Sequence, residues 1–129
     1  MKKISVILIV TAACLSGLPA QASPEVDKLL QKYQQQGAAV AVPEQGKNLW
    51  YSKNGDRGCI NCHGSTPADT GRHVRTNKAI KPMAASVNPE RYQDSKKVEK
   101  WFLRNCKWTL GRLCTAQEKA NTLDWLNSL

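Results

Sequence analysis

The sequence lacks a long apolar run anywhere beyond its N-terminus, and this excludes a membrane-spanning helix from most of the chain. No segment shows a convincing alternation of apolar and polar residues, which is the pattern of a half-buried β-strand. A length of 129 residues suits one domain and leaves little room for two. A hydrophobic fraction of 41% and a charged fraction of 22% exclude compositional disorder. These features predict one globular domain built mainly from α-helices.

The N-terminus has the pattern of a secretory signal peptide. Residues 1–3 include two lysines, residues 4–18 are largely apolar, and residues 20–22 form a small-residue cleavage site. We therefore predict cleavage after Ala22, export to a bacterial periplasm, and a mature domain over residues 23–129. The alternatives are a lipoprotein cleaved before Cys14, although Thr11 stands where a larger aliphatic residue is usual, and an uncleaved anchor.

The sequence has five cysteines, and cleavage of the signal peptide would remove Cys14. Two of the other four stand in a motif with a recognisable chemistry. Cys59 and Cys62 are followed directly by His63, in the order Cys-Ile-Asn-Cys-His. This C-x-x-C-H pattern attaches c-type haem, because the thiols reach two vinyl groups of the porphyrin and the imidazole binds the iron. A redox-active dithiol, a zinc half-site and two structural disulfides are the alternatives. The sequence has no βαβ pattern, which a thioredoxin-like dithiol would need, and it has no further paired ligands for a zinc site. We therefore expect one covalent haem c.

Cys106 and Cys114 are the other two cysteines of the predicted mature domain. In an oxidising compartment, two cysteines without another role are expected to pair. A disulfide that closes so short a loop stabilises the fold by roughly 2–3 kcal/mol if it is unstrained. The bridge would also stiffen the chain beside it, including the residue just before Cys106.

Helix signals begin the predicted mature domain. Ser23 is a suitable N-cap, Pro24 suits the first helical position, and Gly37 is a stop signal. A second helical piece is expected from Pro43. Residues 64–88 have the proline, glycine and weak periodicity of a loop.

Three further helical segments are expected after that loop. One short turn of helix starts at Pro89, and a longer helix follows a cap at Asp94 or Ser95. Thr115 and Glu118 form a capping box that opens the last helix. Short helices around one covalent haem predict the class I cytochrome c fold, in which the haem supplies apolar core that so small a domain otherwise lacks.

The second axial ligand of the iron has three candidates. Met83 follows a proline, as in the Met-ligand segment of cytochromes c, and its ordinary role would be packing on the haem edge. His73 lies only ten residues after His63 and is expected at the surface. Asn105 is followed only by the disulfide loop and the last helix. In a class I cytochrome the distal ligand precedes the C-terminal helix in the same way. This position favours Asn105 and leaves Met83 as the alternative.

Several short runs in the second half of the chain carry a family resemblance: Arg91-Tyr92, Val98-Glu99-Lys100-Trp101, Arg104-Asn105-Cys106, Gly111-Arg112, Cys114-Thr115 and Glu118-Lys119. With residues 75–78 and 82–89, they resemble the sphaeroides haem protein (SHP) family of periplasmic cytochromes c. The resemblance extends from about Cys59 to the C-terminus, whereas the N-terminal third agrees only in its helical character.

The resemblance implies a ligand set and a redox-linked change in it. His63 and Asn105 would hold the ferric iron, with Cys106 and Cys114 as the family disulfide. Reduction would release the Asn, so that ferrous iron binds oxygen, nitric oxide or carbon monoxide. The resemblance also implies a dihaem cytochrome c as the electron donor.

The charge balance adds an expectation about partners. The chain has 19 Lys+Arg against 10 Asp+Glu, a net charge of +9, which favours an acidic redox partner. We expect a monomer and no binding of nucleic acid. The alternative functions are an ordinary low-spin electron shuttle with His63 and Met83 as ligands, and an enzyme such as a small peroxidase or gas reductase. An enzyme would need an acid–base group near the iron, and His73 is the only other histidine.

Overall fold

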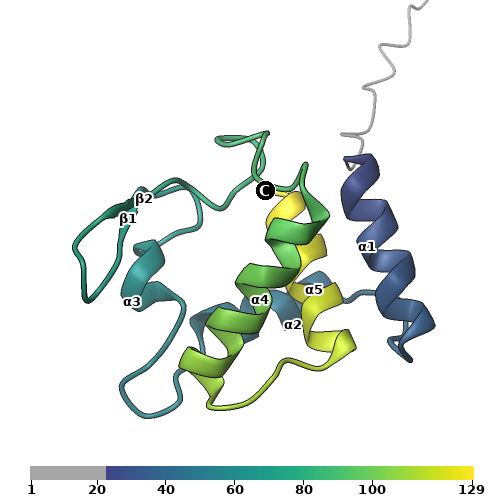
Figure 1. Cartoon of the computed structure of the whole chain (residues 1–129), viewed down its shortest axis with the longest axis horizontal. Coiled ribbons are helices and arrows are strands. Elements are labelled where there is room, and N and C mark those ends of the chain that lie inside the picture. Colours follow the sequence, from purple (N-terminus) through teal and green to yellow (C-terminus); the bar gives the residue numbers. More distant parts are fainter. Residues whose placement is uncertain (1–22) are drawn as a thin grey trace, which may run out of the picture.

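The computed structural model describes residues 23–129, so the predicted signal peptide, its cleavage after Ala22, and Cys14 lie outside the described residues. This part of the chain forms α1 (Pro24–Gln35), α2 (Pro43–Tyr51), α3 (Ile60–His63), β1 (Gly71–Arg72), β2 (Ala79–Ile80), α4 (Ser95–Leu110) and α5 (Ala116–Asn127). Figure 1 shows α1 and α5 on one side of α4, and α3 with the short hairpin on the other. No helix within residues 23–129 is long and apolar enough to cross a membrane.

The helix boundaries follow the predicted capping residues. Ser23 accepts a hydrogen bond at the start of α1, and Asp94 does the same at the start of α4. Thr115 and Glu118 make a complete capping box at the start of α5. Gly37, with a φ of +94°, stands just beyond α1. The predicted caps are therefore confirmed, since each depends on residues that are close in sequence.

Two expectations for the middle of the chain are wrong. Within the predicted loop, β1 pairs with β2 in antiparallel register, Gly71 opposite Ile80. Strands of two residues are too short to produce a visible alternation in the sequence. The segment from Pro89 forms turns and not a helix: the Arg91 N–H donates to the Asn88 carbonyl at 3.0 Å and the Gln93 N–H to the Glu90 carbonyl at 3.4 Å, and these bonds are not consecutive.

The core forms where α5 packs against α1 and α2. Its buried residues are mostly large and apolar: Val26, Leu29, Tyr33, Trp50, Leu123, Trp125 and Leu126. The approach of α2 to α5 is close, because a Cβ atom on Gly46 would lie 2.2 Å from the Asn121 carbonyl oxygen. Glycine is therefore required at this contact. The three-helix core leaves one face of α4 free to border a cavity.

Candidate haem site

The Cys-x-x-Cys-His motif lies on α3 and the turn before it. Asn54 and Arg57 exchange two backbone hydrogen bonds, of 2.8 and 3.2 Å, which close that turn. The His63 N–H donates to the Cys59 carbonyl at 3.0 Å, so a single helical turn spans the motif. Positions i, i+3 and i+4 share one face of a helix, and Cys59, Cys62 and His63 therefore project to the same side.

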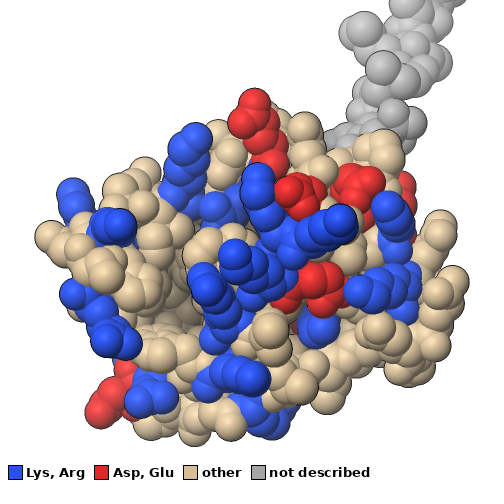
Figure 2. Space-filling model, viewed as in Figure 1, with Lys and Arg blue, Asp and Glu red and all other residues tan. Residues whose placement is uncertain are grey.

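That side faces a cavity of about 290 Å³, lined by Cys59, Cys62 and His63 together with residues of α2, α4, α5 and the segment 81–92. In Figure 2 a hollow is visible beside the basic side chains of α4. The wall is largely apolar and aromatic, and includes Trp50, Tyr92, Val98, Phe102, Leu123 and Leu126. Such a wall suits a large, mostly apolar group.

The two motif thiols are free, and neither forms a disulfide. Burial raises the pKa of the Cys59 thiol to about 11, so it is uncharged at neutral pH. Within residues 23–129 there is no group of three or more His, Cys, Asp or Glu side chains that would hold a metal ion by themselves. The zinc alternative therefore has no ligand set in the described part of the chain.

His63 is held as a neutral imidazole. Burial, with a smaller effect from the charge of Arg91, lowers its pKa to about 4. A neutral imidazole has a lone pair for a metal, whereas an imidazolium does not. The Trp50 ring packs beside it, with the ring centroids 5.1 Å apart.

The cavity also holds polar atoms without a hydrogen-bond partner among the described residues. These buried atoms are His63 Nδ1, Trp50 Nε1 and Thr122 Oγ1, and all three residues line the cavity. Leaving such atoms unpaired is costly, and it is unusual in a complete protein interior. Two free thiols, a neutral imidazole, an apolar wall and these unpaired atoms together fit a haem c.

Two of the three candidates for the second iron ligand line the same cavity as His63. Asn105, on α4, is one, and Met83 is the other. The backbone N–H of Met83 donates to the Pro67 carbonyl at 2.7 Å, which joins its loop to the segment at Pro67. His73 does not line the cavity: it is exposed near the hairpin, where its Nδ1 accepts from the Thr76 N–H at 3.2 Å.

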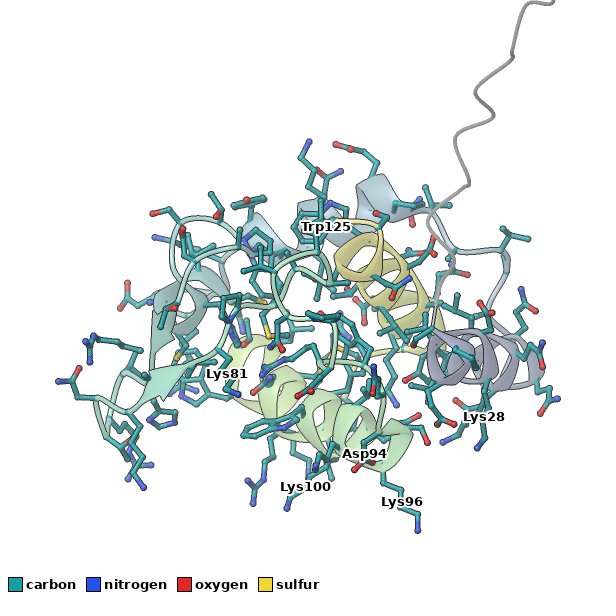
Figure 3. All side chains as sticks on the ribbon, turned by 90° about the horizontal axis from the view of Figure 1, so that it is seen from above. Lys28, Lys81, Asp94, Lys96, Lys100 and Trp125 are labelled. Atoms are coloured by element: carbon teal, nitrogen blue, oxygen red, sulfur yellow. A yellow bond between two sulfur atoms is a disulfide. The ribbon has the colours of Figure 1, made fainter. Side chains whose placement is uncertain are left out.

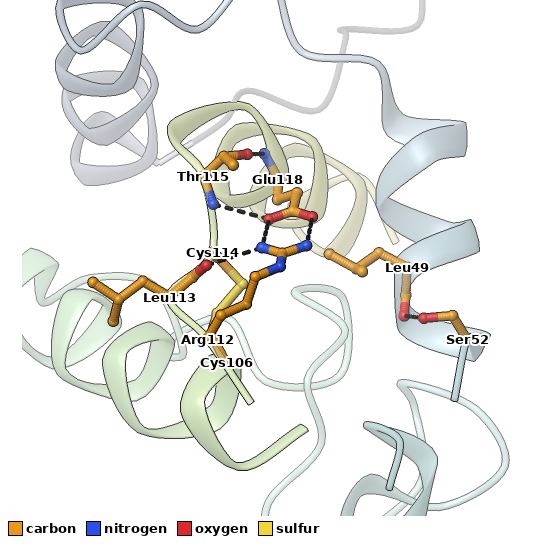
Figure 4. Close-up of polar contacts among 8 residues, drawn as sticks. All are labelled: Leu49, Ser52, Cys106, Arg112, Leu113, Cys114, Thr115 and Glu118. Atoms are coloured by element: carbon orange, nitrogen blue, oxygen red, sulfur yellow. Dashed lines mark hydrogen bonds and ion pairs between the residues drawn. A yellow bond between two sulfur atoms is a disulfide. The ribbon is translucent and has the colours of Figure 1, made fainter. Parts of the chain in front are cut away.

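The chain just after Asn105 is cross-linked twice. Cys106 and Cys114 form the predicted disulfide, with an S–S distance of 1.99 Å. Figure 4 shows the second link, a two-pronged ion pair in which Arg112 donates to Glu118 at 2.7 and 2.8 Å. The same carboxylate accepts from the Thr115 N–H at 2.8 Å, so the loop is joined to the start of α5.

A contact that sequence reasoning missed joins the haem-motif turn to the end of α4. The Arg57 guanidinium lies 5.5 Å from the centroid of the Trp108 ring and donates to the Trp108 carbonyl at 3.3 Å. Trp108 is three residues from Asn105, and both line the cavity. Nothing in the sequence signals this contact, because the two residues are 51 positions apart.

Arg91 is a second residue of the site whose role was not predicted from the sequence. It lines the cavity and is half-buried, and burial lowers the pKa of its guanidinium. Among the described residues its side chain has no ion pair or hydrogen-bond acceptor. Arg91 belongs to the Arg91-Tyr92 run that resembles the SHP family, and this resemblance is the sequence feature that could have indicated its place in the site.

Comparisons with known proteins agree with this geometry. Residues 36–126 match the family described as "Domain of unknown function (DUF1924)". The chain is 37% identical over 123 residues to the cytochrome c-type protein SHP of Cereibacter sphaeroides, an alignment covering 92% of this chain and 95% of that protein.

Two solved structures have the same fold. One is oxidised SHP, described as an oxygen-binding cytochrome c, with a TM-score of 0.74 and 38% identity over 81% of this chain and 96% of that chain. The other is oxidised cytochrome c'' from Methylophilus methylotrophus, with a TM-score of 0.65 and 30% identity over 79% of this chain and 92% of that chain. The predicted fold class, mainly α and cytochrome c-like, is therefore confirmed. The chain belongs to the SHP family of cytochromes c.

Proposed function

We propose that this protein is a periplasmic monohaem cytochrome c in which His63 is a permanent iron ligand and Asn105 is a ligand only in the ferric state. Release of Asn105 on reduction would open one axial position for oxygen, nitric oxide or carbon monoxide. Cys59 and Cys62 would hold the haem through thioether bonds. The observation that carries the proposal is that Asn105 and His63 line one cavity, with Asn105 directly beside a disulfide.

The chemistry of the carboxamide supports a redox-dependent ligand. The haem, when bound, would supply an iron that changes between ferric and ferrous states and can bind a small molecule. The Asn105 side chain offers a hard, neutral oxygen donor, which suits ferric iron and suits ferrous iron poorly. A thioether has the opposite preference. Asn105 is therefore the ligand that reduction weakens most.

The surroundings of Asn105 favour a local movement over a large one. Cys106, the next residue, is bonded to Cys114, and Trp108, three residues after Asn105 on α4, is held by Arg57. These contacts restrain the backbone of the last two turns of α4. The Asn105 side chain can then turn about its own bonds and return, while the helix stays in place.

The second candidate function is a low-spin electron shuttle with His63 and Met83 as ligands. It is favoured by one observation, that Met83 lines the cavity and comes from a loop fixed by the Pro67 carbonyl. An enzyme has less support, since His73 lies away from the cavity and supplies no acid–base group there.

Relatives and charge support the remaining parts of the proposal. The SHP structure is described as an oxygen-binding cytochrome, which favours a gas ligand for this chain. The disulfide is expected in an oxidising compartment such as the periplasm. The net charge of +9 favours an acidic electron donor, for which a dihaem cytochrome c is the family expectation.

Carbon monoxide binding to the reduced protein tests the proposal against the shuttle. We expect fast binding by the wild type, because no protein ligand has to leave ferrous iron first. Met83→Ala should bind at the same rate, and Asn105→Ala should as well. If Met83→Ala instead accelerates binding by an order of magnitude or more, Met83 occupies the ferrous iron and the shuttle is correct.

A further inference from the structure

One helix, α4, both borders the cavity and presents a row of cations beside it. Lys97, Trp101, Asn105 and Trp108 follow one another at spacings of three or four residues, and all line the cavity. Side chains with this spacing lie along one side of a helix. The neighbouring positions, with the same spacing, are Lys96, Lys100, Arg104 and Lys107, all of them exposed. We call these four residues the α4 basic stripe.

The positive charge of the stripe is not neutralised within the described residues. None of its four side chains takes part in an ion pair there. The one acidic residue within α4, Glu99, is paired instead with Lys32 of α1 and Lys119 of α5, at 3.0 and 3.1 Å. Figure 2 shows the resulting gathering of basic side chains over α4, beside the hollow.

Two acidic groups lie near the N-terminal end of the helix. Asp94 caps α4 and pairs with Lys97 at 3.4 Å, and Glu90 lines the cavity in the segment before the helix. In Figure 3, Lys96 and Lys100 project from α4 on the side away from Trp125, and Lys28 projects from the neighbouring helix α1.

An exposed aromatic ring stands between the stripe and the cavity. Trp101 lines the cavity and yet is 48% exposed. The Arg104 guanidinium lies over its ring, 5.8 Å from the centroid. Tryptophan and arginine dominate the binding energy of many protein interfaces, especially where an apolar centre is surrounded by a polar rim. This face has such a centre in Trp101 and such a rim in the stripe.

We infer that this face of α4 is the docking site for an acidic electron-donating protein, with Trp101 at the centre of the contact and the α4 basic stripe as its rim. The inference rests on the proposed function, since the donor supplies the electron that reduces the iron. One electron passes from the reduced donor to the ferric protein, and the donor leaves oxidised by one electron. The partner would thus bind the same helix that carries Asn105, at the mouth of the cavity.

Reduced flavodoxin, an acidic one-electron donor protein, is a suitable probe in stopped-flow kinetics. We expect Lys100→Glu to lower the second-order rate constant of reduction at low salt by about threefold to tenfold. Lys28→Glu makes the same charge change on α1, where the side chain is 70% exposed, and should leave the rate nearly unchanged. Added salt should slow the wild type and reduce its advantage over Lys100→Glu.

A second variant separates apolar contact from charge. Trp101→Ala should slow reduction at high salt as well as at low salt, because burial of the ring is not screened by ions. Equal effects of Lys100→Glu and Lys28→Glu, or a wild-type rate that is independent of salt, would overturn the docking site. Failure of Asn105 ligation is a different result: it is seen when the ferric spectra of the wild type and of Asn105→Ala are the same, with no protein donor present.

Discussion

Replacing Cys106 and Cys114 together by alanine should destabilise the protein by roughly 2.6 kcal/mol. The two cysteines are eight positions apart, and removing a cross-link around a loop of that size restores this much chain entropy to the unfolded state at 25 °C. Alanine is preferable to serine, because Cys106 is 5% exposed and a serine hydroxyl there would be buried. The void left by the sulfur atom adds to the loss.

Urea unfolding followed by tryptophan fluorescence measures the effect. With a typical urea dependence for a small domain, the midpoint should fall by about 1–2 M. Wild-type protein whose disulfide has been reduced chemically is the control, and it should shift by a similar amount. If the midpoint of the double variant stays within about 0.3 M of the wild type, the disulfide does not stabilise the protein by restraining the unfolded chain.

Substitutions at three other positions test separate parts of the structure. Arg91→Gln removes an unpaired cation from the cavity wall, so the reduction potential should fall. Arg91→Lys keeps the charge and should stay close to the wild-type potential. Equal potentials for the wild type and both variants would refute this effect of the charge. Gly46→Ala forces a Cβ to within 2.2 Å of the Asn121 carbonyl and should lower the thermal midpoint clearly, which calorimetry measures. Burial raises the pKa of Glu99, but hydrogen bonds from two lysines outweigh this and leave it below its usual 4.5. Glu99→Gln should therefore cost stability above that pH, and the difference from the wild type should vanish as the pH falls through the lower folded value; a constant difference in urea midpoints would contradict it.

The parts of the fold that the sequence predicts correctly depend on neighbouring residues. The cap of α1 needs only Ser23 and the turn after it, and the capping box of α5 needs Thr115 and Glu118. The haem motif is equally local, since Cys59 to His63 is one helical turn. Such signals are complete within a few positions and can be recognised without a structure.

The parts that escaped prediction are contacts between distant segments. Arg57 meets Trp108 across 51 positions, and no periodic pattern announces such a pair. Arg91 borders the cavity because of the path of the segment 81–92, which local propensity does not determine. The hairpin at Gly71 is stabilised by its pairing with Ile80 and has too few residues to show a strand pattern.

Crystal structures of the oxidised and the reduced protein would test the central proposal most directly, since they locate the Asn105 side chain in both states. We predict that in the oxidised protein the iron is bound by His63 and by the Asn105 side-chain oxygen. After reduction, His63 should remain bound and the Asn105 oxygen should have left the iron, with Met83 packed on the cavity wall in both states. Met83 sulfur bound to the iron in either state, or Asn105 bound unchanged in both, would contradict the proposal.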